Sequence, residues 1–78
     1  MIVRAEWPGY VVDVLVRPGQ EVEEDEPLMI LEGTDSSRTA FYINSPESGK
    51  VREILMEEGD FAYEDDDLVV IGDSDRDE

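Results

Sequence analysis

Carboxylates are the most abundant side chains in this sequence that could take part in chemistry. The 78 residues include 22 Asp and Glu against six Lys and Arg, with no histidine and no cysteine. Paired carboxylates can act as general acid and base where a pocket shifts the pKa of one of them. The acidic groups Glu23–Glu26 and Glu64–Asp67 lie between short apolar runs, where turns are expected. Because so small a chain has little room for a pocket, we interpret both groups as solvated turns.

Other chemically active groups are few. Ser36 and Ser37 carry hydroxyls, but a serine nucleophile needs an adjacent base, and the sequence has no histidine to supply it. Asp73, Asp75 and Asp77 alternate as in a calcium-binding loop, yet this segment lacks the glycine and the distal glutamate that such loops use. We therefore expect no catalytic residue, no metal site and no enzymatic activity.

The acidic excess gives a net charge of −16, which restricts the possible partners. Nucleic acids and anionic membrane surfaces would be repelled, so we expect neither. The charge would attract a basic protein partner at long range, but a solubilising coat or an adaptation to high salt has the same composition. Lys50 is the only lysine, which fits the last interpretation. Without a signal segment or a long apolar run, we expect a cytoplasmic protein.

An internal repeat organises the chain. Residues 9–19 align with 49–59, and residues 24–31 with 64–71, at a constant offset of 40 and without a gap. The identical pairs are Gly9/Gly49, Val11/Val51, Leu15/Leu55, Gly19/Gly59, Glu24/Glu64, Asp25/Asp65 and Leu28/Leu68. We predict two similar halves, about 2–32 and 41–72, joined by a hairpin at 33–40. Residues 73–78 have nothing to bury and are expected to form a disordered acidic tail.

Both halves have the pattern of short β-strands. Strands are predicted at 10–16 and 50–56, near 22 and 61–62, and at 28–31 and 68–71, with lead-in strands at 2–5 and 41–44. Val12, Val14 and Val16 alternate as on one buried face, which leaves Val11 out of step and indicates a bulge. Arg17–Gln20 is typical of a type II turn, with Pro and Gly at its centre. No segment has a helical period. Two such units must pack face to face about a pseudo-twofold axis.

In order and spacing, these motifs resemble the biotinyl/lipoyl carrier domain. Gly9–Val11, Gly19, Pro27–Glu32, Gly49–Val51 and Leu68–Ile71 match its pattern. The resemblance implies an all-β fold, a flattened β-barrel or barrel-sandwich hybrid of about eight strands, with a single domain over 1–72. It also implies a lysine at the tip of the hairpin between the halves, to which biotin or lipoate is attached in such domains.

That lysine is missing from the hairpin. Counting forward from Glu32, its place holds Asp35, and counting back from Pro46, it holds Arg38, so this hairpin is three residues longer than the family pattern. Aspartate has no amine, and arginine stays protonated and is a poor nucleophile. Lys50 aligns with Tyr10 of the first half, and we expect Lys50 at the start of a strand, away from the hairpin tip. We expect no cofactor.

The remaining expectation is a surface function. The hairpin residues Thr34, Asp35, Ser36, Ser37 and Arg38 are candidate partner contacts, as is Trp7. A tryptophan can anchor an interface, although we favour Trp7 as a cover for one end of the core. The same two interpretations are open for the other aromatic residues, most of which we expect in the core or at its rim: Tyr10, Phe41, Tyr42, Phe61 and Tyr63. The predicted function is a non-catalytic biotinyl/lipoyl-like module for protein interaction or structure. The alternatives are a carrier domain of a multienzyme complex modified at an atypical residue, and an enzyme or a subunit that completes one.

Overall fold

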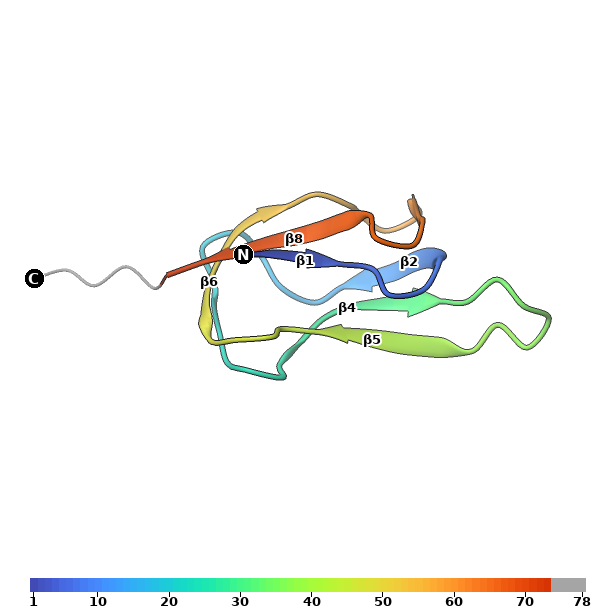
Figure 1. The fold of residues 1–78 in the computed structure, drawn as a ribbon, viewed down its shortest axis with the longest axis horizontal. Coiled ribbons are helices and arrows are strands. Elements are labelled where there is room, and N and C mark those ends of the chain that lie inside the picture. The colour runs from blue at the N-terminus through green and yellow to red at the C-terminus, as the bar shows by residue number, and fades with distance from the viewer. Residues whose placement is uncertain (74–78) are drawn as a thin grey trace, which may run out of the picture.

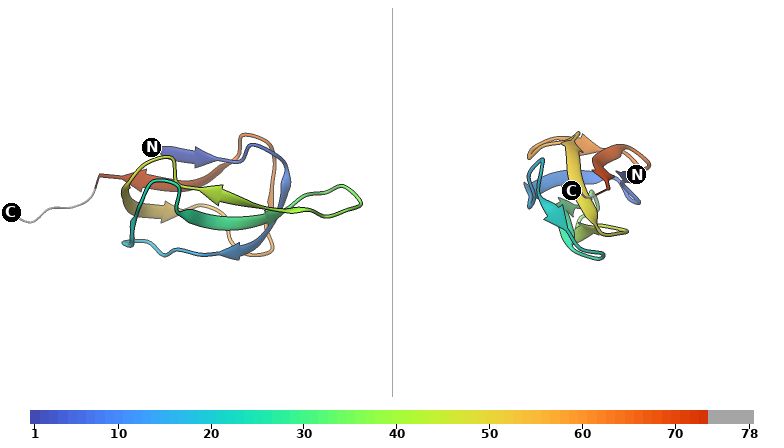
Figure 2. Two further views of the ribbon diagram at one scale, coloured as in Figure 1. Left: turned by 90° about the horizontal axis from the view of Figure 1, so that it is seen from below. Right: turned by 90° about the vertical axis from the view of Figure 1, so that its left-hand side faces the viewer.

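The regular elements of the computed structural model, which describes residues 1–73, are eight strands in two sheets (Figures 1 and 2). They are β1 (Ile2–Arg4), β2 (Gly9–Val14), β3 (Glu21–Val22), β4 (Pro27–Glu32), β5 (Ala40–Asn44), β6 (Gly49–Ile54), β7 (Phe61–Ala62) and β8 (Asp67–Gly72). One sheet has the order β1-β8-β6-β3 and the other β5-β4-β2-β7. The prediction of an all-β fold is confirmed. No helix long and apolar enough to cross a membrane occurs in the described part. The predicted tail, beyond Asp73, lies outside the described residues.

The two sheets repeat one arrangement, as the sequence repeat predicts. β1 corresponds to β5, β8 to β4, β6 to β2, and β3 to β7, and each sheet is ordered accordingly. β4 and β8 share the same sequence of exposed, buried and half-buried positions. The two central pairs also match, since β2 and β4 shift register where β6 and β8 do. The halves are therefore related by the expected pseudo-twofold axis.

The core lies between the sheets and draws equally on both. Its fully buried large side chains include the pairs Leu28/Leu68 and Leu31/Ile71, which occupy equivalent places in the two halves. Ser45 is the buried polar residue of the described part, and its hydroxyl donates to the carbonyl oxygen of Glu47 at 2.6 Å. Burying a polar group without a partner would be costly, so this bond accounts for a serine in the core.

The bulge in β2 is confirmed, but the predicted buried face of this strand is partly wrong. The register with β4 shifts between Val11 and Asp13. Val11 is buried and Val12 is exposed, so the assignment of Val12 to the core face is wrong. A bulge adds one residue to a strand and reverses the alternation beyond it. Val16 is buried, and counting every second residue back from it assigns Val12 to the buried face, because this count ignores the bulge.

The turns have the predicted chemistry. Gly19 has φ of 92°, and the amide of Gln20 donates to the Arg17 carbonyl at 3.1 Å, as a type II turn requires. Gly59 repeats this turn at φ 95°. Asp25, at φ 71°, lies in an exposed acidic turn, which is closed by a hydrogen bond from the Glu26 amide to the Glu23 carbonyl oxygen. The acidic groups are thus solvated turns in the structure as well.

Salt should stabilise this domain. With a net charge of −16 on so small a surface, repulsion among carboxylates opposes the compact state. The Debye length falls from about 30 Å at 0.01 M to about 3 Å at 1 M salt, which screens that repulsion. A relief of about 1 kcal/mol would raise the Tm by about 4–8 °C. Thermal unfolding followed by circular dichroism across a NaCl series measures the effect.

A matched variant identifies the cause of that stabilisation. Glu24, Glu58 and Glu64 are exposed turn residues. Replacing all three by Gln should raise the Tm in low salt and flatten its salt dependence. If the Tm of the variant rises with salt concentration as steeply as that of the unmodified protein, repulsion among these carboxylates is not the cause.

Candidate functional site

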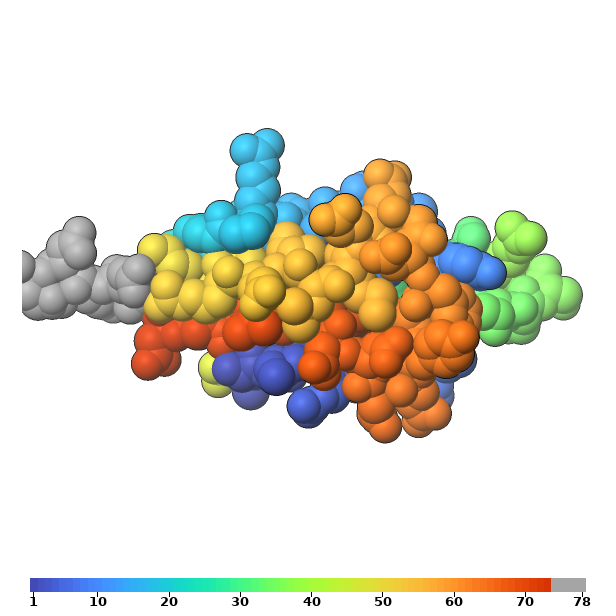
Figure 3. Space-filling model, turned by 90° about the horizontal axis from the view of Figure 1, so that it is seen from above, coloured from blue at the N-terminus to red at the C-terminus, as the bar shows by residue number. Residues whose placement is uncertain are grey.

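The hairpin at 33–39 joins β4 to β5 and projects from one end of the molecule (Figures 1 and 3). The opposite end holds the start of the chain and the end of β8. There the amino group of Met1 donates to the carbonyl oxygen of Ile71 at 2.7 Å. The molecule therefore has two distinct ends, which we call the hairpin end and the terminal end. All five candidate contact residues in the hairpin are exposed at the hairpin end.

Asp35 organises the tip of the hairpin. Its carboxylate oxygen Oδ1 accepts from the amide of Arg38 at 3.0 Å and from the hydroxyl of Ser37 at 2.9 Å. The Arg38 amide also donates to the Asp35 carbonyl oxygen at 3.1 Å. Below the tip, the amide of Gly33 donates to the carbonyl oxygen of Thr39 at 2.9 Å. The Asp35 side chain thus closes the turn, a common role of aspartate at such positions.

A shallow hollow lies beside the base of the hairpin. Its volume is about 460 Å³, and its lining residues are Tyr10, Glu32, Gly33, Thr34 and Arg38. Tyr10 comes from β2, next to the end of β4, where it pairs with Glu32. The structure therefore brings Thr34 and Arg38 together with an aromatic residue from outside the hairpin.

The single lysine of the chain lies at the terminal end. Lys50 is half-buried in β6, where it pairs with Glu21 on one side and with Gly72, at the end of β8, on the other. Its counterpart in the other half, Tyr10, lies at the hairpin end. The prediction from the alignment of the two halves, that Lys50 is remote from the tip, agrees with this placement.

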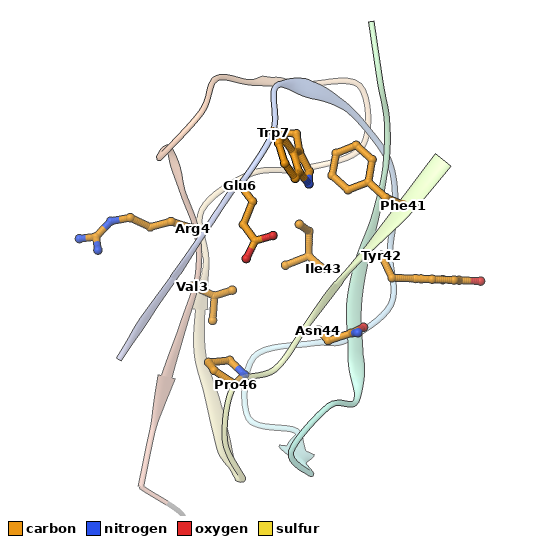
Figure 4. Close-up of a pocket in the computed structure, with 9 residues that line it drawn as sticks. All are labelled: Val3, Arg4, Glu6, Trp7, Phe41, Tyr42, Ile43, Asn44 and Pro46. Atoms are coloured by element: carbon orange, nitrogen blue, oxygen red, sulfur yellow. The ribbon is translucent and has the colours of Figure 1, made fainter. Parts of the chain in front are cut away.

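Trp7 follows β1 and lines a separate groove of about 370 Å³ between β1 and β5 (Figure 4). Its side chain is 61% exposed, so the interpretation of Trp7 as a cover for the core is wrong. Trp7 and Phe41 lie at the same end of the groove, Glu6 points into it, and Arg4 points away. The Arg4 side chain instead forms an ion pair with Asp67 at 2.9 Å.

Neither hollow assembles catalytic groups. The acceptor of the Ser37 hydroxyl is an exposed carboxylate, and no imidazole exists in the sequence to act as its base. The groove beside Trp7 is lined by one carboxylate, that of Glu6. Among residues 1–73, no cluster of three or more metal-ligating side chains occurs.

One surface was not singled out from the sequence. Most of the tyrosines and phenylalanines were expected to be core or rim residues, but Tyr10 and Tyr63 are exposed and make edge-to-face ring contacts with the half-buried Phe61. Tyr10 and Phe61 are a cross-strand pair of β2 and β7. A comparison of the two halves, position by position, is the signal that could have found this cluster.

The two sheets and the tip-forming hairpin match the architecture of biotin- and lipoyl-type domains. Residues 1–71 match the family described as "Biotin-requiring enzyme", and the chain belongs to this family. It is 38% identical over 61 residues to the dihydrolipoyllysine-residue acetyltransferase component of the pyruvate dehydrogenase complex of Pseudomonas aeruginosa. That match covers 78% of this chain and 11% of the relative.

Carboxylases form the second group of relatives. The chain is 36% identical over 67 residues to pyruvate carboxylase of Aspergillus niger, covering 86% of this chain and 5% of the enzyme. The urea carboxylase structure of Kluyveromyces lactis superposes with a TM-score of 0.84 at 26% identity, over 92% of this chain and 6% of that one. The chain thus spans about a tenth or less of the length of these relatives. The resemblance inferred from the sequence is confirmed.

Proposed function

We propose that this chain is a non-catalytic biotinyl/lipoyl-type domain that carries no cofactor and works by binding another protein. The observation that supports this most directly is the content of its hairpin. The place of an attachment lysine holds Asp35 or Arg38, and the Asp35 carboxylate is committed to closing the turn. Neither side chain offers an amine that could form an amide bond with biotin or lipoate.

The proposed partner is a cytoplasmic protein with a basic surface, and nucleic acid and membrane are not proposed. The charge of −16 would speed association with such a surface, and added salt would weaken this attraction. The hairpin residues 34–38 and Trp7 are exposed at places where a partner could reach them. The family relatives include subunits of large enzymes, so the partner we propose is a component of such an assembly.

Intact mass measurement tests the absence of modification. The chain is co-expressed with a biotin ligase or a lipoate ligase and the matching cofactor, and is then analysed by mass spectrometry. We expect the mass of the unmodified chain in both cases, because no amine stands at the tip. The matching domain of the Pseudomonas aeruginosa acetyltransferase component is the positive control.

An Arg38→Lys variant examines the physical reason. It supplies a primary amine at the tip while keeping the charge, and acylation of this variant alone would show that the amine is what the hairpin lacks. A biotinyl or lipoyl mass on the unmodified sequence would overturn the proposal. Peptide mapping would then identify the atypical residue and support the carrier alternative.

A further inference from the structure

The aromatic residues of this chain break the symmetry between its halves. All six fall at positions whose counterpart, 40 residues away, is not aromatic. The pairs are Trp7/Glu47, Tyr10/Lys50, Phe41/Met1, Tyr42/Ile2, Phe61/Glu21 and Tyr63/Glu23. The repeat preserves Gly9/Gly49, Gly19/Gly59 and most of the apolar core positions, so the fold fixes those positions in both halves. It does not fix the aromatic positions.

Three of these residues form one cluster on the surface. The rings of Tyr10 and Phe61 are 4.9 Å apart between centroids, and those of Phe61 and Tyr63 are 4.8 Å apart, both edge to face. Tyr10 is 52% exposed and Tyr63 is 65% exposed. Each contact places the edge of one ring against the face of the other, so the rings hold one another in place, while the two tyrosines keep more than half of their area open to solvent.

The same location in the other half is occupied by charged residues. Lys50, Glu21 and Glu23 are the counterparts of Tyr10, Phe61 and Tyr63, and β3 pairs with β6 as β7 pairs with β2. The backbone therefore accepts charged side chains at these three places. The aromatic cluster is not needed to complete the core, and a surface role accounts for its presence.

The surroundings of the cluster are acidic. Asp60 precedes Phe61, Glu64 follows Tyr63, and Glu32 pairs with Tyr10. Arg38, which lines the same hollow as Tyr10, is the one cation among the residues that line that hollow. Aromatic faces beside carboxylates attract a cation twice, through the ring quadrupole and through the negative charge.

We propose that the cluster Tyr10–Phe61–Tyr63 binds an arginine- or lysine-bearing segment of a partner protein by cation–π contact. The inference rests on the proposed function of protein binding and specifies the chemistry of the partner. Charge complementarity selects this occupant, because a cationic side chain placed over the rings lies among acidic neighbours. A second copy of this chain, itself strongly acidic, would be repelled.

Titration with a synthetic peptide of alternating glycine and arginine, followed by NMR amide shifts, tests the proposal. The titration is run in about 1 M NaCl, where the Debye length of about 3 Å removes diffuse attraction to the acidic surface. We expect shifts concentrated at residues 9–10, 32–38 and 60–64. A peptide with citrulline, the uncharged analogue of arginine, should give much smaller shifts.

Variants distinguish cation–π contact from nonspecific binding to an apolar surface. Replacing Tyr10, Phe61 and Tyr63 together by Leu keeps an apolar surface and should weaken binding about fivefold to thirtyfold, as expected for cation–π contacts. Tyr42→Leu is the matched control, because Tyr42 is 61% exposed on β5 and lies outside the cluster. It should leave the affinity unchanged, and unchanged circular dichroism should show that both variants fold.

Several outcomes would overturn the inference. Shifts spread over the whole acidic surface, equal affinity of the triple variant, or equal binding of the citrulline peptide would each do so. Sedimentation that shows a dimer dissolved by the triple variant would assign the cluster to self-association instead. These results are independent of the mass measurement, so failure here leaves the absence of a cofactor untouched.

Discussion

Replacing Leu68 by Ala should destabilise the domain by about 2–5 kcal/mol. Leu68 is fully buried between the two sheets, so the substitution removes its packing and leaves a cavity. Small domains have a total free energy of unfolding of about 5–15 kcal/mol, so the loss is a large part of the whole. Urea unfolding at fixed salt measures it as a shift in the midpoint with an unchanged m-value.

The pseudo-twofold axis provides an internal check on that result. Leu28 is the counterpart of Leu68 and is equally buried, so Leu28→Ala should cost a similar free energy. Leu55, 39% exposed, is the matched control for removing the same atoms near the surface, and Leu55→Ala should cost much less. A loss below about 0.5 kcal/mol for Leu68→Ala would contradict the assigned core, because surface substitutions have effects of that size.

Gly49→Ala should be severely destabilising for a different reason. A Cβ atom at Gly49 would lie 2.4 Å from the carbonyl oxygen of Gly72 and 2.8 Å from Cγ2 of Ile71. The first obstacle is backbone, so it cannot move aside without separating β6 from β8. Forcing extra atoms into such a place costs about 1–3 kcal/mol or more. Thermal and urea unfolding should both report the loss.

Gly33→Ala is the control for that substitution. The nearest atom to a Cβ at Gly33 is the carbonyl oxygen of Thr39 at 3.5 Å, an ordinary contact. Its free energy of unfolding should stay the same or rise by about 0.4–1 kcal/mol, because alanine restricts the unfolded chain. Gly9, the counterpart of Gly49, meets the Glu32 carbonyl oxygen at 2.6 Å and should behave as Gly49 does. Equal stability of Gly49→Ala and Gly33→Ala would refute the close approach.

The sequence was sufficient to predict most of the fold because the fold is repeated within it. Each glycine turn and apolar run appears twice, so a strand or turn predicted in one half can be checked against the equivalent residues of the other half. The strand faces were harder to predict. Val12 and Val11 are both valines, and only the register shift against β4 decides which of them is buried.

The candidate site was predictable only where it is local in sequence. The extra length of the hairpin follows from counting residues, and Asp35 and Arg38 are close neighbours in the chain. The aromatic cluster is not local, since Tyr10 meets Phe61 only through the pairing of β2 with β7. Trp7 was interpreted as a cover for one end of the core because a chain this small has few large residues to spare, yet the core closes without it.

The placement of the start of the chain beside the end of β8 has a mechanical consequence. β1 and β8 run antiparallel, and Met1 and Ile71 are joined at their common end. A force applied between Met1 and Gly72 would open the hydrogen bonds of this pair one after another, as in unzipping, and would meet little resistance. A force between the hairpin and Gly72 would run along the strands and load many bonds at once. The same domain is therefore weak to a force between Met1 and Gly72 and strong to a force between the hairpin and Gly72.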